Sequence, residues 1–97
     1  MRCDYAPTTA MVRYAYQQLG DTDDLDYMVT SGREFDRWLV VARPPLLKPT
    51  DVYMMSEDEQ YARLEESWLD GNLDNKQASY VAGIIWLTCR ARFLKPE

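Results

Sequence analysis

Residues 78–89 read ASYVAGIIWLTC, the longest apolar run in a chain of 97 residues. The run is too short to cross a bilayer, which takes about 20 residues in a helix. Across Val81–Leu87 it is apolar nearly all round, the pattern of a helix that others surround. We therefore expect a C-terminal helix at the centre of the core, opened by the cap pair Asp74 and Gln77 and running to about Leu94.

Three amphipathic helices are expected ahead of it, at about residues 10–19, 31–43 and 57–70. The second and third begin with the S-x-x-E pattern of a capping box, at Ser31 and Ser56. Each shows apolar residues at the i, i+3, i+4, i+7 spacing of one buried face. In the third helix this face is predicted to hold Tyr61, Leu64 and Trp68, with Gly71 ending the helix.

The predicted fold class is all-α. We expect one domain over residues 1–97, a compact bundle of about four helices with the C-terminal helix central. Two points stay open. Residues 38–42 also fit a short strand, although the cap at Ser31 and the flanking charges favour a helix, and residues 51–55 are compatible with an extra helical turn.

The composition argues against an enzyme. The chain has no histidine, the commonest general base and a common metal ligand. Its four glycines are scattered, so no phosphate-binding loop is present, and no nucleophile motif occurs. The segment 70–74 begins like a calcium loop, but Asn75 and Val81 stand where that loop needs Gly and Glu. We expect no catalytic residue, no cofactor and no metal.

Cysteine usage and net charge indicate the compartment and disfavour one class of partner. Cys3 and Cys89 lack metal-site spacing, so we expect a reduced, cytoplasmic protein with Cys89 packed as a small hydrophobe. A Cys3–Cys89 bridge is the alternative. From residues 1–7, which hold no apolar stretch, we expect no secretory signal and no membrane association. The net charge of −5 makes nucleic acid an unfavourable partner.

One surface is a candidate for binding. Residues 50–75 hold eight acids and one base, a balance of −7. On a helical wheel, six residues of the third helix share a face away from its apolar stripe. They are Asp58, Glu59, Ala62, Glu65, Glu66 and Leu69. This acidic face is either solvated surface, a binding surface for a basic host protein, or part of a DNA-mimicking surface, for which a net −5 is weak support.

Two short segments resemble a pattern in small orphan proteins of actinobacterial phages. Residues 7–16, PTTAMVRYAY, resemble a T-x-x-x-V-R-x-x-Y helix, and residues 34–39, EFDRWL, match the helix that follows it in that group. The span from 7 to 39 is about a third of the chain. In that group acidic and alanine-rich residues follow the second motif, whereas Val40–Pro44 follows here. The resemblance implies a phage gene product in the host cytoplasm and no particular activity.

The predicted function is therefore a non-catalytic interaction protein, phage-encoded, that binds and modulates a host protein. One alternative is a small DNA-binding regulator that uses the helix at 31–43, where Arg33, Arg37 and Arg43 are interleaved with acids. Another is a structural or homo-oligomeric subunit, because exposed aromatic side chains often become interfaces.

Overall fold

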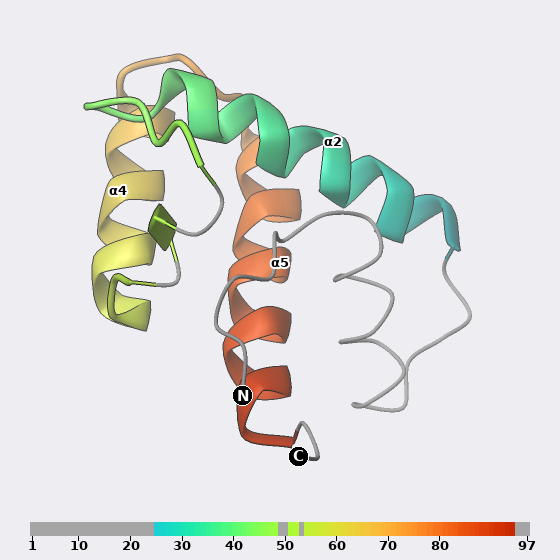
Figure 1. The fold of residues 1–97 in the computed structure, drawn as a ribbon. Helices are drawn as coiled ribbons and strands as arrows, with labels where there is room; N and C mark the ends of the chain where they lie inside the picture. The colour runs from blue at the N-terminus through green and yellow to red at the C-terminus, as the bar shows by residue number, and fades with distance from the viewer. Residues whose placement is uncertain (1–24, 49–50, 53, 95–97) are drawn as a thin grey trace.

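The computed structural model describes residues 25–48, 51–52 and 54–94, and these are all-helical apart from turns and connectors (Figure 1). The helices of this part are α2 (Leu25–Val41), α4 (Glu57–Leu69) and α5 (Asn75–Leu94). The all-α class is confirmed over these residues, which hold three helices where about four are expected for the chain. The helix expected at 10–19 lies outside the described residues.

The C-terminal helix is central, as predicted. Helix α5 packs against both α2 and α4, which make far fewer contacts with each other. In Figure 1, α2 crosses the N-terminal part of α5, and α4 runs beside it. Val81, Ile84 and Ile85 of α5 are fully buried, but Trp86 is 46% exposed. The helix therefore has a core side and a solvent side, which the apolar run alone does not reveal.

Helix α2 begins at Leu25, so the prediction that it starts at Ser31 is wrong. Ser31 lies inside the helix and is fully buried, and its hydroxyl has no hydrogen-bond partner among the described residues. The buried face of α2 continues upstream of Ser31 to Met28, which is only 3% exposed. Burial of this longer face stabilises the extra turns, and tertiary packing outweighs the local capping pattern. The helix ends at Val41, close to the predicted stop ahead of Pro44.

We expect the substitution Ser31→Ala to stabilise the protein by about 1 kcal/mol, because it removes a buried, unpaired hydroxyl and improves helix propensity. Urea unfolding followed by circular dichroism measures the change. Ser56→Ala is the matched control. Ser56 is the N-cap of α4, where its Oγ accepts a 3.1 Å hydrogen bond from the Glu59 N–H, and its loss should cost about 1 kcal/mol. If both substitutions destabilise the protein equally, Ser31 acts as a helix cap, as the sequence predicts.

The turn at residues 70–74 joins α4 to α5, and its polar residues serve to end one helix and to cap the next. Gly71 has a φ of 81°, and the hydrogen bonds around it form a Schellman motif. Asp74 Oδ1 accepts from the Gln77 N–H at 2.8 Å, and Gln77 Oε1 accepts from the Asp74 N–H at 2.9 Å. The predicted helix stop at Gly71 and the cap pair ahead of α5 are both confirmed.

A side chain of α4 holds the connector between α2 and α4 in place by a hydrogen bond. The Arg63 guanidinium donates to the Pro44 carbonyl and lies 3.8 Å from Met55 Sδ. Leu46, within the connector, is buried in the core. Residues 51–52 are helical, so the helical turn left open by the sequence is present.

Candidate functional site

An open groove of about 600 Å³ runs between α4 and α5. On the α5 side its lining includes Ala78, Ser79 and Ala82, which succeed one another over little more than one helical turn. On the α4 side Ala62 contributes another small side chain. Side chains this short leave space between two helices that larger residues would fill. The groove therefore follows from a local run of small residues at the helix pair.

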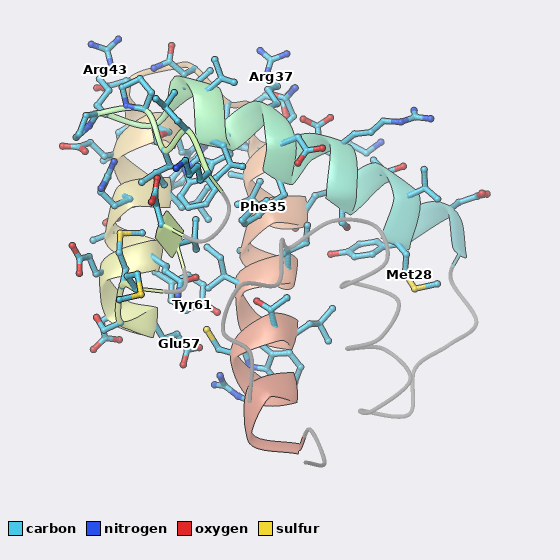
Figure 2. All side chains as sticks on the ribbon, in the orientation of Figure 1. Met28, Phe35, Arg37, Arg43, Glu57 and Tyr61 are labelled. Carbon is cyan, nitrogen blue, oxygen red and sulfur yellow. The ribbon has the colours of Figure 1, made fainter. Side chains whose placement is uncertain are left out.

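Two aromatic residues of α4, Tyr61 and Trp68, also line the groove. Trp68 is 41% exposed, and its Nε1 donates a 2.6 Å hydrogen bond to Asn75 Oδ1 across the helix pair. This bond holds the indole in one orientation while much of its ring faces solvent. Tyr61 is partly buried against the core, and it is labelled between the two helices in Figure 2.

The buried face of α4 is rotated by about 65° from the predicted apolar stripe, at 100° per residue. The sequence predicts that Tyr61, Leu64 and Trp68 face the core. Leu64 is buried, but Trp68 is exposed, and the other buried residues of α4 are Gln60 and Ser67. Both polar side chains find partners: the Gln60 amide donates to a connector carbonyl at 3.2 Å, and the Ser67 hydroxyl donates to a carbonyl one turn earlier, also at 3.2 Å. Polar groups paired in this way are buried at little cost.

All six residues of the predicted acidic face are exposed on α4. The groove lining includes Asp58, Ala62 and Glu65. It does not include Glu59, Glu66 and Leu69. The structure thus places half of this face beside apolar surface. Among the described residues that line the groove, two are carboxylates and none is Lys or Arg. Sequence reasoning missed the α5 wall, although the closely spaced Ala78, Ser79 and Ala82 are a signal for it.

An ion pair joins the start of α4 to α5. Arg90 Nη1 lies 2.7 Å from Glu57 Oε2, and the guanidinium carbon lies 5.1 Å from the centre of the Trp86 ring. The hydrogen bond that Arg90 donates to the Glu57 carboxylate raises the pKa of Arg90, which stays a cation. Burial raises the pKa of Tyr61 above its usual value, and the nearby Glu57 carboxylate adds to this effect. The Tyr61 hydroxyl is therefore neutral at physiological pH and does not act as a base there.

Two arginines of the predicted DNA-binding helix are engaged with the turn at 70–74. Arg43 Nε lies 3.6 Å from Asp70 Oδ2, and Arg37 Nη2 donates to the Asn72 carbonyl at 3.5 Å. Figure 2 shows Arg37 on the outer side of α2 and Arg43 just beyond the C-terminal end of that helix, both pointing away from α5. Asp36 lies next to Arg37 in the chain, and burial raises the pKa of its carboxyl group. This surface combines cations with acids and gives no uniformly basic patch.

Cys89 is buried beside Gln60, whose Nε2 lies 3.8 Å from Cys89 Sγ. Its expected packing in the core is confirmed, while Cys3 lies outside the described residues. Within 25–48, 51–52 and 54–94, no group of three or more acidic or cysteine side chains could hold a metal ion. None of the described helices is both long enough and apolar enough to cross a membrane.

No protein-family model matches the chain, and comparison with curated proteins and with solved structures gives no match.

Proposed function

We propose that this protein is a non-catalytic binding domain that receives a segment of a host protein in the groove between α4 and α5. One observation carries the proposal: the groove combines apolar surface with an exposed tryptophan held in place by Asn75. The resemblance of residues 7–16 and 34–39 to small phage proteins makes a host protein the partner class, met in the host cytoplasm. Binding there would modulate that partner by occupying one of its surfaces.

The groove already holds an exposed, fixed tryptophan side chain before a partner binds. Tryptophan contributes more than most side chains to protein interfaces, especially where it is surrounded by packed neighbours. The hydrogen bond from Trp68 Nε1 to Asn75 fixes the indole in advance, which lowers the ordering cost of binding. Grooves between paired helices commonly accept an extended or helical segment of another protein.

The DNA-binding alternative lacks comparable support. A DNA-binding helix needs cations that are available to phosphates. Arg33, Arg37 and Arg43 are all exposed, but acids alternate with them along the chain, and Arg37 and Arg43 already contact the turn at 70–74. The groove lining adds two carboxylates. A homo-oligomer is tested separately, by sedimentation of the purified chain, because host lysate holds no copy of a phage-encoded protein.

The test is capture from host lysate with three immobilised proteins. Ser79→Trp fills the groove from an exposed position of its lining, and Lys76→Trp places the same side chain on an exposed position of α5 outside the lining. We expect a saturable host protein to bind the wild type and Lys76→Trp, and to be lost from Ser79→Trp. Retention by Ser79→Trp, or the absence of any saturable partner, would contradict the proposal. Circular dichroism confirms that all three proteins are folded.

A further inference from the structure

We infer that the segment bound in the groove is an amphipathic α-helix with two basic residues seven positions apart and large apolar residues between them. This inference rests on the proposed function and specifies the chemistry of its partner.

The two carboxylates of the groove determine the spacing of the two basic residues on the partner helix. Asp58 and Glu65 both belong to the lining, both are exposed, and they lie seven residues apart on α4. Two helical turns separate them, about 10.5 Å along the axis. A partner helix lying along α4 presents its residues i and i+7 at the same separation. Lysine or arginine at those two positions would face both carboxylates, and no cation competes for them among the lining residues that the structure describes.

The small residues of the groove determine which side chains the partner helix carries between its two basic residues. Ala62 stands between Asp58 and Glu65 on α4, and the opposite wall is made by Ala78, Ser79 and Ala82. Large apolar side chains at i+3 and i+4 of the partner would fill this space and lose water contact. The resulting pattern, K-x-x-Φ-Φ-x-x-K with Φ a large apolar residue, is the same in both directions. It therefore does not depend on whether the partner helix runs parallel or antiparallel to α4.

The chain itself does not supply this pattern. None of its eleven Lys and Arg residues is followed by another at the seventh position after it. A second copy of this protein therefore lacks the complementary helix, which favours a different protein as the occupant. Nucleic acid is disfavoured, because its phosphates would face Asp58 and Glu65.

The probe is an alanine-rich peptide of about 18 residues, long enough to be helical in water. One version carries Lys at i and i+7 with Leu at i+3 and i+4, and a second carries Glu in place of both Lys. Isothermal titration calorimetry measures binding to the folded full chain. Replacing attraction by repulsion at two exposed sites should favour the Lys peptide by about tenfold. The double substitution Asp58→Lys/Glu65→Lys should reverse this preference.

The chain offers a matched control on the same helix. Glu59 and Glu66 are also acidic, exposed and seven residues apart, but they lie outside the groove lining. The double substitution Glu59→Lys/Glu66→Lys changes the net charge equally and should keep the preference for the Lys peptide. Circular dichroism verifies the fold of both double variants.

Three results would overturn the inference: equal binding of both peptides, no binding of either, or the same reversal in the Glu59/Glu66 control. These results leave the proposed function standing if Ser79→Trp still loses the host protein. If Ser79→Trp keeps it, the proposed function itself is wrong. The two failures are therefore distinguishable.

Discussion

The substitution Trp38→Ala is expected to lower the unfolding free energy by about 3–5 kcal/mol, a large part of the stability of a small domain. Trp38 is 0% exposed, the bulkiest of the fully buried side chains on the described part of the chain. Its ring packs edge-to-face against Phe35, with centroids 5.2 Å apart. Alanine would leave a cavity at the face of α2 that packs on α5. Urea unfolding followed by circular dichroism at 222 nm measures the loss.

Trp38→Phe separates the packing of the ring from its polar atom. The Trp38 Nε1 is buried with no hydrogen-bond partner among the described residues. Phenylalanine keeps an aromatic ring and removes this unpaired N–H, so the relief partly offsets the smaller cavity. We expect a cost of about 1 kcal/mol or less. A loss as large as that of Trp38→Ala would show that the indole N–H contributes a stabilising hydrogen bond.

The helix ends that the sequence predicts are those fixed by chemistry within a single turn. Ser56, Gly71 and the Asp74–Gln77 pair act through hydrogen bonds to nearby backbone groups, so their spacing is sufficient to locate them. Ser31 carries the same pattern as Ser56 but is buried inside α2. The capping pattern at Ser31 cannot show that the helix has already begun upstream of it. The earlier start depends on the buried face of α2, which continues upstream to Met28.

The sequence predicts residues of the candidate site on its α4 side, whereas its α5 wall is marked only by closely spaced small residues. A helical wheel places Asp58, Ala62 and Glu65 on one face, because that property belongs to a single helix. The other wall comes from α5, and its position depends on how the two helices are rotated against each other. The wheel failed for Trp68 because hydropathy assigns a tryptophan to the core. The hydrogen bond from buried Gln60 to a backbone carbonyl lets the buried face of α4 rotate toward Gln60 at little cost.

The same limit applies to α5, where the run 81–87 is apolar nearly all round and only the structure distinguishes its buried side from its exposed side.

We expect Ile84→Asp to abolish folding at neutral pH. Ile84 is 0% exposed, and a buried, unpaired carboxylate adds to the lost packing, for a total above about 5 kcal/mol. Burial raises the pKa of such a carboxyl group in the folded state. The folded form then binds the proton more tightly, so the deficit relative to wild type should shrink as the pH falls.

Trp86→Asp is the control that tests this assignment. It introduces the same carboxylate two positions along α5, about 200° around the helix. Trp86 is 46% exposed, and the Arg90 guanidinium lies beside its ring. A carboxylate there remains hydrated and has a cation nearby, so the expected cost is about 2–3 kcal/mol, mainly from the lost apolar contact of the half-buried ring. Circular dichroism spectra and urea midpoints of both variants decide the matter. If Trp86→Asp unfolds the protein and Ile84→Asp does not, the core side of α5 has been assigned to the wrong face.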